Sequence, residues 1–164
     1  MARAATPAIK ALLAAEIPHE VLRYEHDPDN ESFGDEAVNR LAGVGGVDPQ
    51  QVFKTLVVAL PNNGLAVAVL PVPFQLSLKA AAATLGVAKA TMADRAAAER
   101  SSGYVIGGIS PLGQRKRLPT VVDSSALQWD RVLCSAGKRG WDVALHPKDL
   151  IALTDAVTAD IRAS

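Results

Sequence analysis

The segment from Gly107 to Pro119 places three glycines and two prolines within thirteen residues and carries the consecutive cations Arg115, Lys116 and Arg117. Glycine lets the main chain approach a ligand closely and presents its N–H groups, while proline fixes the path of the chain. The composition therefore predicts a loop rather than a helix or a strand, with the basic triplet supplying charge for a phosphate or carboxylate. The alternative is a surface turn whose Lys and Arg side chains are simply solvated.

A second segment, residues 135–140 with the sequence SAGKRG, repeats this pattern of small residues around two cations, Lys138 and Arg139. The same two interpretations apply to it. One is an anion-binding loop, and the other is a solvated surface turn.

Lys54 favours the ligand-binding interpretation. It lies in residues 52–60, VFKTLVVAL, which predict a strand because they are rich in β-branched residues and lie between turn-forming segments. Alternate side chains of a strand share a face, so Lys54 is expected on the same face as Val52, Leu56 and Val58. An ammonium group on an apolar face must reach solvent, find a partner or bind a ligand. Lys54 is therefore a candidate functional residue, the alternative being a lysine at a strand edge that reaches solvent.

Five segments, in order along the chain, resemble the signature segments of the bacterial YbaK-type Cys-tRNA deacylases. They are residues 24–28, YEHDP; 33–36, FGDE; 52–56, VFKTL; 103–113, GYVIGGISPLG; and 135–140, SAGKRG. The resemblance extends from Thr6 to the last predicted helix, although the glycine-rich residues 43–46 look like a small insertion. This family belongs to the editing domains related to the insertion domain of prolyl-tRNA synthetase. The resemblance implies one α+β domain over residues 1–164, with a curved, barrel-like mixed sheet flanked by helices.

The resemblance also implies an enzyme that needs no nucleophile of its own. In this family the cysteinyl thiol of a mischarged tRNA attacks its own ester carbonyl, which releases the tRNA and forms a cyclic thiolactone that later hydrolyses. A thiol requirement solves a problem of selectivity, because a small apolar pocket discriminates amino acids of similar size by only ~1–3 kcal/mol. Seryl esters would react poorly, since a hydroxyl group ionises much less readily than a thiol.

Roles for individual residues follow from the same resemblance. Lys54 matches the family's essential lysine, which would orient the substrate and stabilise developing negative charge. Backbone N–H groups around Gly107 and Gly108 would hold the aminoacyl carbonyl or amine. The remaining residues expected to bind the substrate are Tyr24, Phe33, Thr55, Ile109, Ser110, Pro111, Ser135, Gly137 and Asp142. The residues expected to contact tRNA phosphates are Arg115, Lys116, Arg117, Lys138 and Arg139.

Some of these residues have an alternative role. Tyr24 and Phe33 could be ordinary core residues. Asp142 could form an ion pair with Arg139 instead of binding a substrate.

The sequence disfavours several other kinds of chemistry. His19, His26 and His146 are scattered, so we expect no metal site. The glycine-rich segments lack the spacing of nucleotide-binding loops, so no cofactor is expected. Cys134, the only cysteine, lies in an apolar run and is interpreted as a core residue rather than a nucleophile. His26 precedes Asp27, but adjacent side chains point apart, which argues against a dyad.

Composition limits the size and the environment of the protein. With 164 residues, 49% of them hydrophobic, the chain is long enough for one domain with a core. Seventeen Lys and Arg balance seventeen Asp and Glu, so any nucleic-acid affinity must come from local patches. A single cysteine, the lack of a signal-peptide core and the lack of a long apolar run predict a cytoplasmic protein that does not enter membranes.

Local patterns predict a mixed set of helices and strands. Helices are expected from the Thr6-Pro7 start to residue 17, over 32–41 from a capping box at Ser32, over 76–85, over 94–100, and from Pro147 through Ile161. Residues 43–46 are expected to form a flexible turn. Strands are expected at 19–24, 52–60, 65–70, 120–122, 131–135 and 141–145.

Three functions agree with the sequence. The first is a deacylase for Cys-tRNA(Pro), with Cys-tRNA(Cys) as a further substrate and prolyl-tRNA synthetase as a potential partner. The second is a related editing enzyme that removes alanine or another small amino acid from tRNA. The third is a non-catalytic module that binds tRNA or a synthetase.

Overall fold

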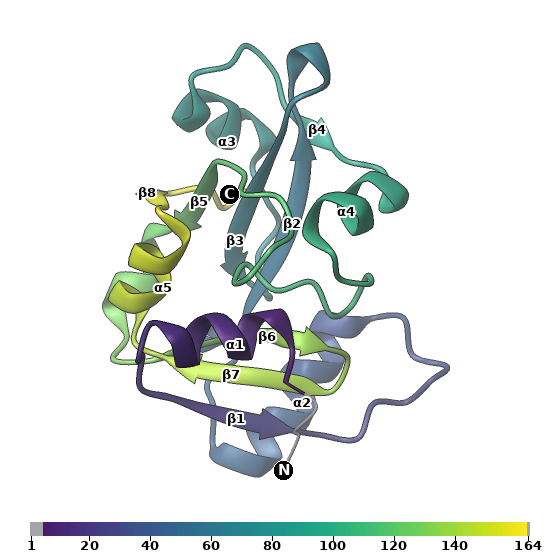
Figure 1. Ribbon diagram of the computed structural model, residues 1–164, viewed down its shortest axis with the longest axis vertical. Helices are drawn as coiled ribbons and strands as arrows, with labels where there is room; N and C mark the ends of the chain where they lie inside the picture. Colours follow the sequence, from purple (N-terminus) through teal and green to yellow (C-terminus); the bar gives the residue numbers. More distant parts are fainter. Residues whose placement is uncertain (1–4, 164) are drawn as a thin grey trace.

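The computed structural model describes residues 5–163 and has five α-helices and eight strands in this range (Figure 1). The α-helices are α1 (Pro7–Ala14), α2 (Phe33–Gly45), α3 (Leu78–Leu85), α4 (Arg95–Ser102) and α5 (Pro147–Thr154). The strands are β1 (His19–Arg23), β2 (Phe53–Ala59), β3 (Leu65–Pro71), β4 (Thr91–Met92), β5 (Thr120–Asp123), β6 (Val132–Lys138), β7 (Trp141–Leu145) and β8 (Val157–Ala159). These elements confirm the predicted α+β class.

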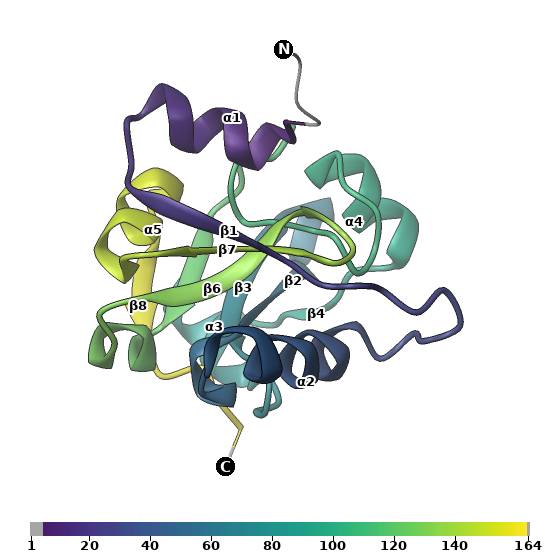
Figure 2. The same cartoon turned by 90° about the horizontal axis from the view of Figure 1, so that it is seen from below.

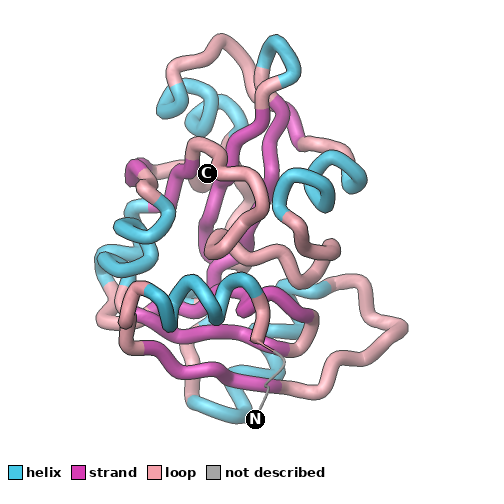
Figure 3. The backbone as a smooth tube through the Cα atoms, in the orientation of Figure 1, coloured by secondary structure: helices cyan, strands magenta, loops and turns pink. Residues whose placement is uncertain are grey.

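The strands form two sheets. A three-stranded antiparallel sheet has the order β1-β7-β6, and a five-stranded sheet has the order β4-β2-β3-β5-β8. The larger sheet is mixed as predicted, because β5 is parallel to both β3 and β8 while β2 is antiparallel to its neighbours. The two groups of strands run in different directions (Figure 3) and meet at a single bridge between Val52 and Leu133. Within residues 5–163 the two sheets remain open and do not close into a barrel.

The three-stranded sheet is covered by a helix on each face, α1 on one side and α2 on the other (Figure 2). The alternation along β6 explains this arrangement, since successive strand side chains point to opposite faces. Cys134 packs in the same cluster as Leu12 of α1, and its neighbour Leu133 packs with Leu41 of α2. The strand is therefore apolar on both faces, as its sequence indicates.

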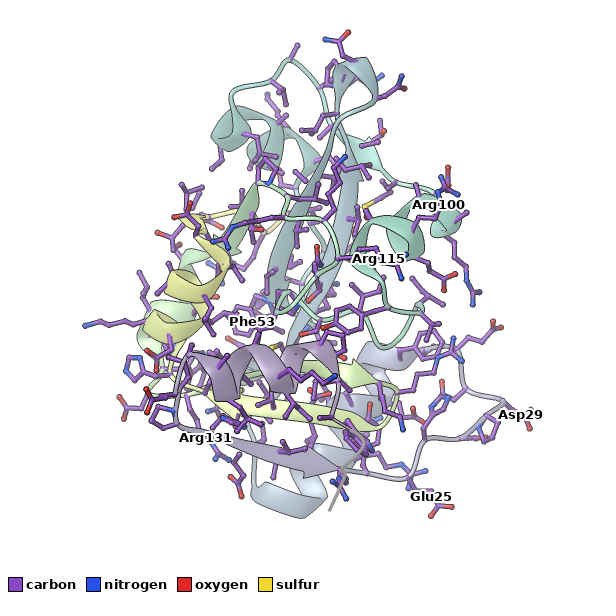
Figure 4. The ribbon with its side chains drawn as sticks, viewed as in Figure 1. Glu25, Asp29, Phe53, Arg100, Arg115 and Arg131 are labelled. Atoms are coloured by element: carbon purple, nitrogen blue, oxygen red, sulfur yellow. The ribbon has the colours of Figure 1, made fainter. Side chains whose placement is uncertain are left out.

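The main core lies between the two sheets. Phe53, labelled in Figure 4, belongs to this core together with Val67 and Val69 of β3 and Val143 of β7. The opposite face of the larger sheet is covered by α3, whose Ala82 packs against β2 and β3. The start of β2 therefore lies where the two sheets and α2 converge.

The N-terminal helix begins as predicted. The Thr6 hydroxyl accepts a hydrogen bond from the Ile9 N–H, and Pro7 occupies the first turn. The Thr6 hydroxyl also donates to the Ala136 carbonyl of β6, which ties α1 to the three-stranded sheet.

The second helix starts at Phe33 with Ser32 as its N-cap residue, as predicted, but its predicted end was wrong. The helix α2 continues through Gly45, and the following residue, Gly46, has a positive φ of 61°. Ser32 makes no side-chain capping hydrogen bond, so the predicted capping box is absent. Asp35 and Glu36 instead place acidic groups in the first turn, where the helix dipole stabilises them.

The predicted closing helix was also wrong in its second half. The helix α5 ends at Asp155, a residue with a φ of 53°, and the chain continues as β8 along β5. Ile161 is fully buried, and its N–H donates to the Asp123 carboxylate at 2.9 Å. The apolar residues that suggested a helical face therefore belong to a short helix, a strand and an anchored C-terminal segment.

Candidate active site

A cavity of about 220 Å³ lies where β2, α2 and the loop around Gly107 converge. The first turn of α2, residues 52–56 and residues 106, 107 and 109 form much of its wall, and β6 and β7 each contribute one residue. Eight residues predicted from the sequence line it: Tyr24, Phe33, Lys54, Thr55, Gly107, Ile109, Ser135 and Asp142. Seven lining residues were not predicted as site residues: Gly34, Ala37, Val52, Phe53, Leu56, Val72 and Ile106.

Lys54 is half-buried, and its Nζ donates a hydrogen bond of 3.3 Å to the Val72 carbonyl. Desolvation lowers the pKa of Lys54, and the negative charge of Asp35 partly offsets this effect. In the described part of the chain no carboxylate lies within ion-pair distance of its ammonium. Gly34 lets α2 approach this point, because a Cβ atom there would lie 3.0 Å from a Val72 methyl carbon. The cavity thus contains a cation that is not neutralised.

Asp142 is the buried carboxyl group of the cavity, with only 5% of the residue exposed. It forms no ion pair with any residue of the described chain, so the alternative pairing with Arg139 is wrong. Desolvation raises the pKa of Asp142 to about 7. Burial also raises the pKa of Tyr24, and the charge of Asp142 adds to this effect. A bound cationic group would stabilise the Asp142 carboxylate.

The two hydroxyl groups of the cavity differ in their hydrogen bonding. Thr55 Oγ1 is buried and has no hydrogen-bond partner among the described residues. Ser135 Oγ accepts the N–H of Gly137 at 3.0 Å and thereby supports the irregular end of β6. A buried hydroxyl without a partner is unfavourable unless something else bonds to it. Thr55 is therefore the hydroxyl better placed for a ligand.

The two glycines predicted to be catalytic have different surroundings. Gly107 has a φ of 84° and lines the cavity, and its N–H makes no hydrogen bond to any described residue. The Gly108 N–H donates to the Val105 carbonyl at 2.9 Å. A Cβ atom on Gly108 would lie 3.1 Å from the backbone nitrogen of Arg139, so close backbone packing favours glycine there. Of the two, Gly107 has the N–H group that remains for a ligand.

Three predicted substrate-binding residues do not line the cavity. Ser110 is fully buried, and its hydroxyl accepts the Leu112 N–H at 3.2 Å. Pro111 is buried in the same loop, and Gly137 packs against Tyr104 and Thr6. These residues shape the loops around the cavity rather than its surface.

The predicted tRNA-binding cations fall into two groups. Arg115, Lys116 and Arg117 are exposed. The loop that carries them is held along α4, because the Arg115 and Lys116 N–H groups donate to the carbonyls of the last two residues of that helix. By contrast, the Lys138 ammonium lies over the Trp141 ring at 4.7 Å. Arg139 donates to a backbone carbonyl, that of Ile106.

A partly buried pair near the cavity, His26 and Glu36, was not predicted. Glu36 Oε1 lies 2.6 Å from His26 Nδ1, and Glu36 Oε2 accepts the Asp27 N–H at 2.9 Å. Desolvation alone would raise the pKa of Glu36, but the hydrogen bonds from His26 and Asp27 outweigh it and lower the pKa. Glu36 rather than Asp27 is the partner of His26. A carboxylate next to Ala37 on the buried face of α2 was the signal that could have revealed this pair.

Cys134 does not line the cavity. Cys134 is fully buried, and burial raises the pKa of its thiol, which confirms its predicted place in the core. Among residues 5–163, no three His, Cys, Asp or Glu side chains gather closely enough to hold a metal ion. Within the same range no helix has the length and hydrophobicity needed to span a membrane.

Comparisons with known proteins identify the family. The model of the aminoacyl-tRNA editing domain matches residues 35–153, a range that includes Lys54, Gly107 and Asp142. The chain therefore belongs to the family of aminoacyl-tRNA editing domains. A protein of Enterococcus faecalis (strain ATCC 700802 / V583), named "Putative Cys-tRNA(Pro)/Cys-tRNA(Cys) deacylase EbsC", is 37% identical over 116 residues, which cover 71% of each chain. These matches confirm the resemblance read from the sequence.

Solved structures share the fold. The crystal structure of the hypothetical protein APE2540 has a TM-score of 0.83 at 22% identity, over 96% of this chain and 100% of that one. A second crystal structure, described as "a putative trans-editing enzyme for prolyl tRNA synthetase", has a TM-score of 0.80 at 23% identity, over 100% of this chain and 99% of that one. Both have the fold of this chain, and the match to the second confirms the predicted editing-domain fold.

Proposed function

We propose that this protein is an aminoacyl-tRNA deacylase that removes cysteine from mischarged Cys-tRNA(Pro) in trans, with Cys-tRNA(Cys) as a further substrate. One observation carries the proposal: the cavity contains an unneutralised lysine and a buried carboxyl group but no activated nucleophile. Among the described residues, neither Thr55 nor Ser135 is hydrogen-bonded to a histidine or a carboxylate. The membership of the editing-domain family and the name of the Enterococcus relative support the same substrate class.

The substrate's own thiol would then supply the nucleophile. Its sulfur attacks the ester carbonyl carbon, the C–O bond to the terminal ribose breaks, and the thiol proton passes to the departing ribose oxygen. The cyclic thiolactone that forms is later hydrolysed by water. This route leaves the protein with three tasks, which are to orient the aminoacyl group, to stabilise the developing oxyanion and to keep competing amino acids out.

The cavity residues suit these tasks. The Asp142 carboxylate would bind the α-ammonium group, whose positive charge favours the ionised form of this carboxyl. The Gly107 N–H and the Lys54 ammonium would stabilise negative charge on the ester carbonyl oxygen. The Thr55 hydroxyl, which has no hydrogen-bond partner among the described residues, would form a hydrogen bond with the bound substrate. The small volume, about 220 Å³, favours a small aminoacyl group.

We also propose how the protein binds its tRNA substrate and which protein it works with. Aminoacyl-tRNA is the substrate, and we propose that the exposed residues Arg115, Lys116 and Arg117 bind its phosphates in the cytoplasm. Prolyl-tRNA synthetase is the proposed protein partner, an idea supported by the description of the structural neighbour as a trans-editing enzyme for that synthetase.

Hydrolysis of a panel of charged tRNAs tests the proposal. We expect rapid single-turnover release of cysteine from Cys-tRNA(Pro) and almost none from Ser-tRNA(Pro), which differs from it by one atom. A pocket that works by shape alone would separate the two by only about ten- to a hundredfold. Equal rates for the two esters would contradict the thiol mechanism and indicate that an activated water molecule is the nucleophile.

Two further outcomes distinguish the remaining functions. Preferential hydrolysis of Ala-tRNA(Pro) would identify an editing enzyme for alanine. Binding of tRNA without hydrolysis of any ester would identify a non-catalytic module. An early thiolactone product trapped from Cys-tRNA(Pro) would support the proposed route directly.

A further inference from the structure

Two charged side chains from separate elements hold the peptide groups of Ile106, the residue before Gly107. The Ile106 N–H donates to Glu99 Oε2 of α4 at 2.8 Å. The Ile106 carbonyl accepts from Arg139 Nε, in the turn between β6 and β7, at 2.8 Å. Both polar backbone groups of one residue are therefore fixed by side chains of opposite charge, and hydrogen bonds that involve a charged partner are the stronger kind.

Arg139 also contacts Phe33, in the first turn of α2. Its guanidinium lies over the Phe33 ring at 4.7 Å from the ring centroid. The Phe33 ring in turn packs against Gly107, leaving no space for a Cβ atom there. Arg139 thus connects α2 to the backbone that presents the Gly107 N–H. The side chain of Lys138, the adjacent cation, instead lies over the Trp141 ring.

The helix α4 positions Glu99. The helix α4 begins at Asp94, whose carboxylate caps it by accepting the Ala97 N–H at 2.7 Å. Arg95 lies 3.4 Å from Glu99 Oε2 on the same helix. The hydrogen bond from Ile106 is the main cause that lowers the pKa of Glu99, so its carboxylate stays ionised at neutral pH.

We propose that Glu99 and Arg139 are positioning residues that fix the Gly107 backbone at the cavity. This assigns Arg139 a role other than the phosphate contact expected from the sequence. The expected effect on the rate rests on the proposed function. The fixing of the backbone does not, because it can be observed without any substrate. Misplacement of a reacting or stabilising group by about 1 Å can lower a rate on the order of a hundredfold.

Single-turnover kinetics with Cys-tRNA(Pro) test the consequence. We expect Arg139→Ala to lower the maximal rate by about 10- to 100-fold. The enzyme concentration that gives half of this rate should change by less than about threefold, since uniform binding is retained. Arg139→Lys should recover little of the lost rate, because lysine keeps the charge but lacks the planar guanidinium. This variant also keeps the test valid if Arg139→Ala does not fold.

Lys138→Ala separates positioning from phosphate binding. If both cations contact phosphates, each alanine variant should raise the half-saturating concentration and reduce its salt dependence. The proposal would be overturned if both alanine variants behave in this way and Arg139→Ala keeps the maximal rate of the wild type. A fall in maximal rate for Arg139→Ala with an unchanged salt dependence supports it.

A conservative pair of variants tests Glu99. Glu99→Gln keeps a carbonyl oxygen that can accept the Ile106 N–H, so we expect a rate within about threefold of wild type, whereas Glu99→Ala should lose about as much as Arg139→Ala. Arg95→Ala is the matched control, because it removes the ion pair with Glu99 but leaves the bond to Ile106. Equal losses in Glu99→Ala and Arg95→Ala would assign the effect to the ion pair and overturn the proposal.

Amide hydrogen exchange measured by NMR tests the same contacts without substrate. We expect the Ile106 amide to exchange at least about tenfold faster in Glu99→Ala than in wild type or Arg95→Ala, because its acceptor is lost. The Gly107 amide signal should shift in Arg139→Ala. Unchanged exchange at Ile106 would overturn the proposal. If the wild-type protein hydrolyses no aminoacyl-tRNA, the proposed function fails, and this measurement still decides whether the two residues fix the loop.

Discussion

The Phe33 ring occupies the space that a side chain on Gly107 would need: a Cβ atom on Gly107 would lie 2.6 Å from Phe33 Cδ1. Because Gly107 also has a φ of 84°, both its backbone conformation and its neighbour require glycine. This contact joins the first turn of α2 to the loop that presents the Gly107 N–H. The geometry of the cavity therefore depends on one aromatic ring and one residue without a side chain.

Gly107→Ala should abolish most deacylation, because the added methyl group must displace either the Phe33 ring or the loop. We expect a loss of stability of about 2–4 kcal/mol, the sum of the positive-φ strain and the steric overlap. Gly86→Ala is the matched control, since Gly86 has a φ of 74° and nothing lies within 4 Å of its added Cβ. Urea unfolding and single-turnover rates of both variants test this expectation. A Gly107→Ala protein with wild-type activity would remove Gly107 from the proposed site.

Lys54→Ala should remove most of the activity and leave the fold intact, because the half-buried ammonium forms no ion pair with residues 5–163 whose loss would destabilise the protein. Lys54→Arg should recover little activity, since the guanidinium is larger and planar. Lys79→Ala, at an exposed position on α3, provides the control for the loss of one lysine. Single-turnover rates, with circular dichroism to monitor folding, test the prediction. Near-normal turnover by folded Lys54→Ala would contradict a catalytic role.

Asp142→Asn should stabilise the protein at alkaline pH. The folded-state pKa of about 7 lies above the ordinary value of 3.8, so the folded state binds the proton more tightly than the unfolded state. Wild-type stability should therefore fall as pH rises from about 4 to about 7, by at most about 4 kcal/mol, and then level off. The Asn variant lacks this loss. Its advantage over wild type should be greatest above pH 7 and should disappear towards pH 4.

Urea unfolding between pH 4 and pH 8 measures this difference. Asp130→Asn, at an exposed position, serves as the control and should change the pH profile little. The same carboxylate is proposed to bind the substrate's α-ammonium group, so Asp142→Asn should also weaken substrate binding above pH 7. A stability difference that does not vary with pH would show that burial does not raise the Asp142 pKa.

Replacing Arg115, Lys116 and Arg117 by glutamine should weaken tRNA binding and reduce its salt dependence. If all three side chains contact phosphates, the slope of log affinity against log salt should fall by about 2–3. The double variant Lys79→Gln with Lys89→Gln removes exposed charges from and beside α3 and serves as the control. Filter binding over a series of salt concentrations gives the slopes. An unchanged slope in the triple variant would place the RNA on another surface or assign its docking to a synthetase.

Much of the secondary structure could be predicted from patterns within about ten residues. The Thr6-Pro7 start of α1, the strands β2 and β3 and the start of α5 at Pro147 all depend on local dihedral preferences and on side-chain alternation. Lys54 was identified for the same reason, since a charge on an apolar strand is visible without knowledge of the fold. Local patterns could not distinguish the end of α5 from β8, because an apolar residue in that region suits a helix face and a sheet equally well.

The cavity was decided by contacts between distant segments. The bond between Arg139 and the Ile106 carbonyl spans 33 positions of sequence, and the bond between Lys54 and the Val72 carbonyl spans 18. Such contacts determine that Asp142 is buried with no ion-pair partner in the described part of the chain, that Gly107 keeps its N–H for a ligand and that Arg139 faces the cavity loop. The sequence by itself determined which kinds of residue are present and which elements carry them. Only the tertiary structure decided their partners, because burial and hydrogen bonding depend on what the rest of the chain places beside each side chain.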